Sequence, residues 1–325
     1  MDISARGLNL ADERLGARAL SATDEFFGAK ERLLNPAEPE WRAGVYDANG
    51  KWMDGWESRR RRGPGFDQCV IRLAAPCTLS ALDIDTRHFT GNYAPFASVE
   101  ACRVDADPDA ATEWKQLLGQ SPLRGNQPNL FALSRAEVWT HLRLNMHPDG
   151  GIARLRAYGT VHKDWSRIAA GESVDLAAAL NGGRALACSD EHYGSMHNLL
   201  LPGRNPTMAG GWETRRRREP GFDWVLLALG RPGQIQRVEV DTAHYKGNSP
   251  HQVSLQGALL AGESGLDVAS QSLYWPVLLE PQLMQPDHLN TFSKEWKSIG
   301  PISHLRVNMH PDGGIGRVRV FGRIG

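Results

Sequence analysis

The sequence predicts an all-β protein built from two tandem jelly-roll β-sandwich domains that are related by an internal repeat. Three observations support this fold class. One block of sequence occurs twice, apolar residues alternate with polar ones in several segments, and 34 glycines and 19 prolines supply many turns. Short alternating segments separated by turn residues are typical of β-sandwiches. A chain of 325 residues is also long enough for two domains, each with its own core.

The internal repeat retains polar residues as faithfully as apolar ones. Residues 55–67 read GWESRRRRGPGFD, and residues 211–223 read GWETRRRREPGFD. Residues 141–152 read HLRLNMHPDGGI, and residues 304–315 read HLRVNMHPDGGI. A duplicated fold needs only its apolar pattern and its turn residues. The retained Arg, Glu, Asn, His and Asp side chains therefore indicate a role beyond solvation.

The repeat defines residues 1–159 as the first jelly-roll domain, 160–173 as a connector and 174–325 as the second jelly-roll domain. The two copies differ in length. Gly28 and Trp56 are 28 positions apart, whereas their counterparts Gly194 and Trp212 are 18 apart, so repeat 1 carries ten additional residues here. Repeat 2 carries seven additional residues before His310. Surface loops tolerate such insertions, so we expect both differences to lie in loops.

The strand pattern is clearest where Leu142, Leu144 and Met146 alternate with polar residues, and residues 238–241 and 317–320 alternate in the same way. A period of two with one apolar face predicts half-buried antiparallel strands. Helical periodicity is scarce, with short candidates at residues 10–15, 134–138 and 175–180.

Composition narrows the classes of partner and compartment. Lys plus Arg and Asp plus Glu both total 37, and this zero formal charge argues against nucleic acid as the main partner. No run of about 18 apolar residues occurs, so no membrane span is expected. The first seven residues do not resemble a signal peptide. The four cysteines form no Cys-x-x-Cys pair, which favours a reducing cytoplasm.

The arginine runs are the first candidate for ligand binding. Four consecutive arginines in a strand would alternate between its faces, so at most two could point at one site. The guanidinium fork suits recognition of a carboxylate. The alternative is a solvated loop. Neighbouring acids could neutralise the run, which we expect of Asp67 and Asp223, whereas Glu57 and Glu213 are candidates for chemistry. The selected arginines are Arg59, Arg61, Arg215 and Arg217.

Histidines and asparagines next to turns are the second candidate group. His88 and Asn92 follow a strand, so they are expected on an end loop, and Asn145 and His147 precede an Asp-Gly turn. A turn does not require His, whereas a general acid or base is often His. The counterparts in repeat 2 are His244, Asn248, Asn308 and His310. A divalent metal stays an alternative, although neither His-x-His nor His-x-x-x-His spacing supports it.

These duplicated motifs closely resemble the allantoicase family from about Leu10 to Gly322. The resemblance implies two jelly rolls of the galactose-binding-like type and hydrolysis of allantoate to ureidoglycolate and urea, a hydrolase activity on C–N bonds of linear amidines. It also implies a role in purine nitrogen recovery through allantoin degradation, and a homo-oligomer. No nucleophile motif is present, so hydrolysis by an activated water fits better than a covalent intermediate, and no cofactor is expected.

Allantoate carries one carboxylate and two ureido arms, which indicates roles for the repeated residues. Arginine would bind the carboxylate. Asn92, Asn145 and their counterparts would form hydrogen bonds with the ureido groups. Proton transfer is assigned to a histidine and a carboxylate among His88, His147, His244, His310, Glu57 and Glu213. Two competing hypotheses are a non-catalytic tandem module that binds a small ligand or carbohydrate, and RNA binding through the arginine runs. The residues leave open which repeat holds the site.

Overall fold

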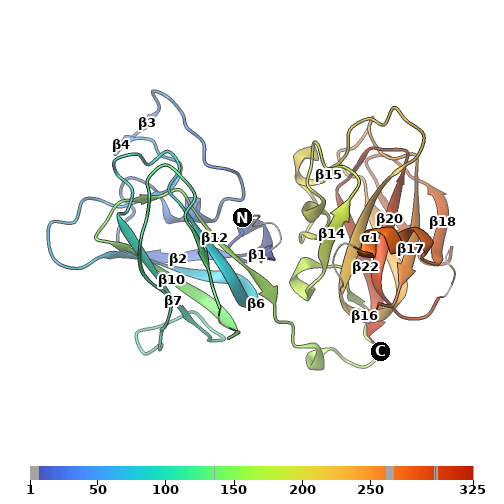
Figure 1. Ribbon diagram of the computed structural model, residues 1–325, viewed down its shortest axis with the longest axis horizontal. Helices are drawn as coiled ribbons and strands as arrows, with labels where there is room; N and C mark the ends of the chain where they lie inside the picture. The colour runs from blue at the N-terminus through green and yellow to red at the C-terminus, as the bar shows by residue number, and fades with distance from the viewer. Residues whose placement is uncertain (1–6, 135, 261–266, 296, 298, 325) are drawn as a thin grey trace. The chain divides into compact units, whose positions relative to one another are not determined.

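The computed structural model describes residues 7–134, 136–260, 267–295, 297 and 299–324. The chain divides into two compact units, Met1–His162 and Lys163–Gly325. Each unit carries an eight-stranded antiparallel sheet, so the all-β prediction is confirmed (Figure 1). Residues 1–6, on which the signal-peptide prediction depends, lie outside the described residues. Residue 135 of the helix candidate at 134–138 also lies outside them.

The strands of unit 1 are β1 (Leu8–Asn9), β2 (Arg18–Ala22), β3 (Tyr46–Asp47), β4 (Gly50–Lys51), β5 (Trp56–Glu57), β6 (Asp67–Asp85), β7 (Phe96–Cys102), β8 (Lys115–Pro122), β9 (Leu130–Ala132), β10 (Trp139–His147), β11 (Gly151–Ile152) and β12 (Arg154–Val161). Those of unit 2 are β13 (Val174–Asp175), β14 (Arg184–Cys188), β15 (Trp212–Glu213), β16 (Asp223–Asp241), β17 (Gln252–Ala258), β18 (Val277–Leu283), β19 (Leu289–Phe292), β20 (Ile302–His310), β21 (Gly314–Ile315) and β22 (Arg317–Ile324).

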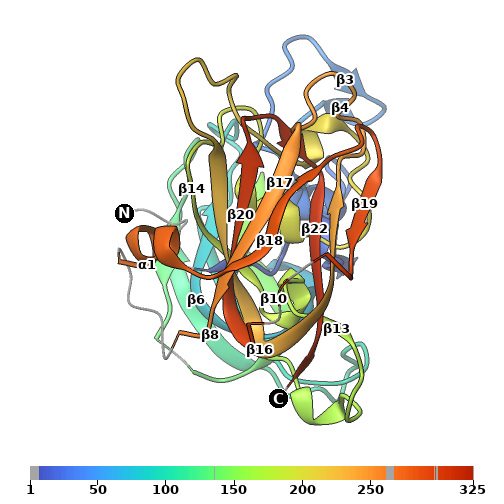
Figure 2. The same ribbon diagram turned by 90° about the vertical axis from the view of Figure 1, so that its right-hand side faces the viewer.

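One long strand joins the two layers of each sandwich. The first half of β6 pairs with β2 and β10, and its second half pairs with β9 and β12. β16 repeats this change of partners with β14 and β20, then β19 and β22 (Figure 2). The apolar faces of both halves enclose one core. Leu142, Leu144 and Met146 are fully buried there, as their alternation predicts.

Helices are few and short in the described residues. Candidate 10–15 contains only η2 (Glu13–Leu15), and candidate 175–180 contributes to η5 (Ala179–Asn181). The described residues of 134–138 form no helix. The remaining helices are η3 (Lys30–Leu34), η4 (Trp165–Arg167), η6 (Met196–Leu200), η7 (Met208–Gly210), α1 (Asp267–Gln271) and η8 (Ser272–Tyr274). No helix in these ranges is long and apolar enough to cross a membrane.

A buried ion pair fixes the additional segment of repeat 1 to the sandwich. Arg154, at the start of β12, is completely buried and its Nη2 lies 2.6 Å from Asp54 Oδ2. The same guanidinium donates to the carbonyl oxygens of Ala37 and Asp54. Desolvating two charges is costly, so such a pair is stable only when its hydrogen bonds are nearly complete. The segment before β5 therefore depends on Asp54.

Replacing Asp54 tests this dependence. We expect Asp54→Ala to lower the free energy of unfolding by about 3 to 5 kcal/mol, because it leaves a buried guanidinium without its counter-charge. Urea unfolding of the whole chain measures the change. Glu137→Ala breaks an exposed pair with Lys115 and should change stability by less than about 0.5 kcal/mol. A loss below about 1 kcal/mol for Asp54→Ala would show that the pair is not structural.

Candidate active site

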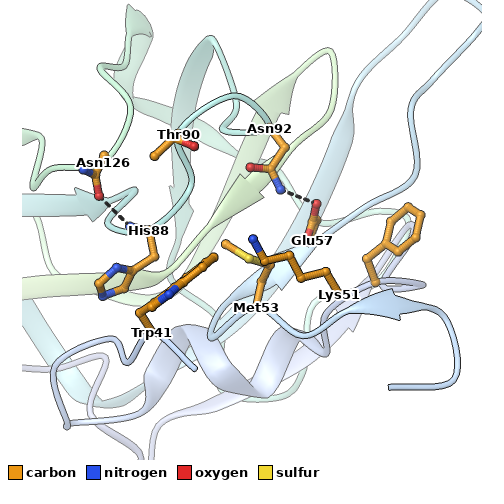
Figure 3. Close-up of a pocket in the computed structure, with 9 residues that line it drawn as sticks. Trp41, Lys51, Met53, Glu57, His88, Thr90, Asn92 and Asn126 are labelled. Carbon is orange, nitrogen blue, oxygen red and sulfur yellow. Dashed lines mark hydrogen bonds between the residues drawn. The ribbon is translucent and has the colours of Figure 1, made fainter. Parts of the chain in front are cut away.

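A cavity of about 640 Å³ opens in unit 1, and residues of β4, β5 and the loop after β6 contribute to its lining. Its lining combines aromatic, amide and ionisable side chains (Figure 3). The lining residues are Phe27, Trp41, Lys51, Met53, Glu57, His88, Thr90, Asn92 and Asn126. Three of the residues that the sequence selected, Glu57, His88 and Asn92, therefore share one cavity.

Glu57 is placed in the cavity by backbone pairing on both sides. β5 pairs with β11 through Glu57 and Gly151, and an isolated bridge joins Glu57 to Gly28. The Gly151 amide donates to the Asn92 carbonyl oxygen at 2.8 Å. The Asn92 Nδ2 in turn donates to Glu57 Oε1 at 2.6 Å. One oxygen of the carboxylate is thus held, and Oε2 has no such bond to Asn92.

Burial raises the pKa of the Glu57 carboxyl, the Asn92 hydrogen bond lowers it, and the nearby charge of Asp47 raises it. The net direction is upward because desolvation of the charged form is the largest effect. A carboxylate with a raised pKa is a stronger base than an exposed one. It can therefore accept a proton from water more readily than an exposed carboxylate does, and its protonated form can donate that proton to a leaving group.

His88 forms hydrogen bonds with two other segments of the chain that surround the cavity. Its φ is 69°, an uncommon left-handed conformation for a residue with a side chain. The His88 amide donates to Asn126 Oδ1 at 2.9 Å, and its Nε2 lies 2.9 Å from the Pro39 carbonyl oxygen. A carbonyl only accepts, so Nε2 donates this hydrogen bond. His88 therefore connects the loop after β6 to the segment that leads to Trp41.

Repeat 2 reproduces this geometry. Asn248 Nδ2 donates to Glu213 Oε1 at 2.5 Å. His244 has a φ of 71°, its amide donates to Asp287 Oδ1 at 2.8 Å, and its Nε2 lies 2.9 Å from the Asn205 carbonyl oxygen. The Glu–Asn pair and the strained histidine are thus properties of the duplicated fold.

The arginine runs are placed differently from the expectation. β5 ends at Glu57, so the run lies outside a strand and the premise of alternating faces is wrong. Arg59 lies 2.7 Å from Asp24, and Arg61 lies 3.1 Å from the buried Asp67. Neither arginine lines the cavity. Their role in substrate binding stays a prediction.

The second run has the same arrangement. Arg215 lies 2.9 Å from Asp190, and Arg217 lies 3.1 Å from the buried Asp223. All four selected arginines thus bind acids of their own repeat, which is a structural use of these charges.

Asn145 and His147 lie on the polar face of β10 and are not among the cavity-lining residues. His147 Nε2 is 2.9 Å from Ser98 Oγ, and burial lowers the pKa of its imidazole. Asn145 Nδ2 donates to Ser98 Oγ and to Glu100. The structure therefore separates these two residues from the Glu57 cavity.

The counterparts in repeat 2 form a similar group. Asn308 Nδ2 donates to Ser254 Oγ at 3.3 Å, and His310 Nε2 lies 2.9 Å from the same hydroxyl. Burial also lowers the pKa of His310. The catalytic and binding roles predicted for these pairs stay predictions.

Sequence reasoning missed six lining residues: Phe27, Trp41, Lys51, Met53, Thr90 and Asn126. Trp41 and Lys51 belong to the part of repeat 1 that has no counterpart in repeat 2. The sequence shows that length difference, but length alone predicts only a tolerated loop. Among the described ranges, no group of three or more His, Cys, Asp and Glu could hold a metal ion.

The fold and the cavity define a protein of two jelly-roll repeats with a small-molecule site in the first. Repeat 1 holds a half-buried carboxylate, amides and aromatic rings around a space that fits a small polar molecule.

Comparison with known proteins identifies the family. The family model described as Allantoicase repeat matches residues 8–162 and 174–325. A Pseudomonas fluorescens (strain SBW25) protein named "Probable allantoicase" is 51% identical, over 98% of this chain and 96% of its own length. "Probable allantoicase 2" from Burkholderia pseudomallei (strain K96243) is 52% identical, over 98% and 95%. The crystal structure of allantoicase from Saccharomyces cerevisiae has a TM-score of 0.80 at 35% identity, covering 97% of this chain and 92% of that one. The chain belongs to the allantoicase family.

The raised pKa of Glu57 predicts a pH-dependent effect of Glu57→Gln on stability. Folding raises this pKa, so the stability contributed by the protonated group is complete at about pH 4 and is lost as the pH rises through the folded value. Glutamine keeps an oxygen for Asn92 and does not ionise. We therefore expect Glu57→Gln to gain stability relative to the parent between about pH 4 and pH 8.

Urea unfolding midpoints at several pH values measure this difference. Glu113→Gln, which removes an exposed charge, serves as the matched control. A difference between parent and Glu57→Gln that stays constant across the range, or follows the control, would contradict the assignment of a desolvated carboxyl at Glu57.

Proposed function

We propose that this chain hydrolyses allantoate to ureidoglycolate and urea, as an allantoicase of allantoin degradation, and that the cavity of repeat 1 is its active site. The observation that carries the proposal is the Glu57–Asn92 pair, which presents a carboxylate of raised pKa to a cavity lined by amides. Membership of the allantoicase family supplies the substrate. The two asparagine amides of the lining can form hydrogen bonds with ureido groups.

Glu57 can perform both proton transfers of the reaction. The protonated Glu57 carboxyl donates its proton to the leaving ureido nitrogen as the C–N bond breaks, and the lone pair of the other ureido nitrogen stabilises the electron-poor central carbon. Urea leaves, and the Glu57 carboxylate then accepts a proton from a water whose oxygen bonds to that carbon. Glu57 returns to its protonated form, so no proton is gained or lost by the enzyme. General acid–base catalysis of this kind contributes about 100- to 10,000-fold.

The other polar residues would orient the substrate. Asn92 fixes Glu57 Oε1, which leaves Oε2 for the water. Asn126 binds the His88 amide through its Oδ1, so its Nδ2 is the group available to a ureido carbonyl. In this scheme His88 is a positioning residue, because its Nε2 is occupied by Pro39. Preorganised donors of this kind act by fixing the reacting geometry before the chemical step.

Further properties follow from the family as proposals. We expect a homo-oligomer, and a cytoplasmic location is supported by the free state of all four cysteines. The scheme assigns both proton transfers to Glu57 and requires no metal. Chelator-treated protein should therefore release urea from allantoate at the rate of untreated protein. Activity that returns only after a divalent metal is added would contradict this part of the scheme.

Paired substitutions test which repeat is active. We expect Glu57→Gln to lower kcat for urea release by about 100- to 10,000-fold, because glutamine cannot accept the proton of water. Glu213→Gln removes the matched carboxylate of repeat 2 and should leave kcat within about threefold. Circular dichroism and unfolding midpoints control for folding. Full activity of Glu57→Gln, or a larger loss for Glu213→Gln, would place the chemistry elsewhere. A folded parent that releases no product would favour a binding module.

A further inference from the structure

Repeat 1 carries a segment over its cavity that repeat 2 does not have. We call residues 39–53 the strap; it contains the ten additional residues of repeat 1 and the β3–β4 hairpin. Its first residue, Pro39, accepts the hydrogen bond from His88 Nε2. Near its end, the guanidinium groups of Arg32 and Arg42 lie 5.5 and 4.8 Å from the centroid of the Trp52 ring. The strap is thus held at both ends.

The tip of the strap is also attached to the sandwich. Asn49 Nδ2 donates to the Phe26 carbonyl oxygen at 2.8 Å. Tyr46 pairs with Lys51 across the hairpin, so the direction of the Lys51 side chain is set by the strand register. An ordered hairpin loses less conformational freedom on ligand binding than a flexible loop.

Lys51 brings a positive charge to the cavity. Its Nζ lies 3.9 Å from the centroid of the Trp41 ring, within the range of a cation–π interaction. Figure 3 shows the amine directed into the cavity, between Trp41 and the Glu57–Asn92 pair. Among the nine lining residues, Lys51 is the only one with a permanent positive charge. Within the described ranges, no carboxylate lies within ion-pair distance of it.

The two arginines selected from the neighbouring run are already paired, and no arginine lines the cavity. Arg59 and Arg61 bind Asp24 and Asp67. An ammonium group that neighbouring acids leave unpaired, above an aromatic ring and facing a cavity, is suited to an anionic group of a ligand.

We propose that Lys51, oriented by Trp41, binds the carboxylate of the substrate and makes the cavity of repeat 1 selective for carboxylate-bearing ureido compounds. This inference rests on the proposed function, because it assigns a second contact within the same cavity. Glu57 then faces the ureido arm that leaves, and Lys51 faces the carboxylate that stays. The substrate is held at two points, which fixes the C–N bond that breaks.

Repeat 2 shows why the strap matters. It has no counterpart of Trp41 or Lys51. Its nearest equivalent charge is Lys246, at the position of Thr90, and Lys246 lies 3.8 Å from Asp287. Asp287 takes the place of Asn126 beside the strained histidine. The lysine of repeat 2 is therefore neutralised by its own repeat.

The test compares allantoate with diureidoacetamide, which carries a neutral amide in place of the carboxylate. We expect Lys51→Met to raise KM for allantoate by about 10- to 100-fold with kcat within about threefold, because a contact made equally to substrate and transition state is lost. Parent protein should prefer allantoate over diureidoacetamide in kcat/KM, and Lys51→Met should lose that preference. Lys51→Arg should recover part of it, because the charge is kept.

Lys246→Met is the matched control and should behave as the parent does. Trp41→Ala should raise KM in the parent and add little in the Lys51→Met background, since both changes act on one contact. If Lys51→Met discriminates between the two substrates as well as the parent does, the inference is wrong, although the proposed function stands. If the folded parent acts on neither substrate, the proposed function itself fails.

Discussion

The site depends on the backbone of Glu57. This residue pairs with Gly151 on one side and with Gly28 on the other, and Gly151 in turn binds Asn92. A Cβ at Gly28 would overlap the Gly55 carbonyl oxygen, and a Cβ at Gly151 would overlap the ring of Phe89. The close approach of three chain segments therefore requires glycine at both positions. That approach brings the carboxylate and the Asn92 amide together in a partly desolvated position, which raises the pKa of Glu57.

The two repeats share this construction and differ in what surrounds it. Both keep the Glu–Asn hydrogen bond and a histidine at positive φ, a conformation that costs about 1 kcal/mol or more and needs support from its surroundings. Only repeat 1 adds the strap, with Trp41 and Lys51 above the carboxylate. Duplication thus accounts for the Glu–Asn pair and the histidine at positive φ. The insertion in repeat 1 accounts for the positive charge of Lys51. The proposal that repeat 1 holds the active site rests on this difference.

The sequence predicted the parts of the fold that local patterns determine. The alternation of Leu142, Leu144 and Met146 identified β10, because a half-buried strand has a period of two. It did not predict that β6 changes partners halfway along, since such pairing is settled by segments distant in the chain. Comparison of the repeats found Glu57, His88 and Asn92. The same comparison could not find Lys51 or Trp41, which occur once. It also could not predict that Arg59 pairs with Asp24, because this partner is 35 residues away in sequence.

The most direct test of this account is the crystal structure of Glu57→Gln with allantoate bound. The variant should bind the substrate and hydrolyse it too slowly to lose it from the crystal. The account predicts allantoate in the cavity of repeat 1, with one ureido arm beside residue 57 and Asn92 and with its carboxylate at Lys51. Allantoate bound beside Glu213, or on the polar face of β10 near His147, would contradict it.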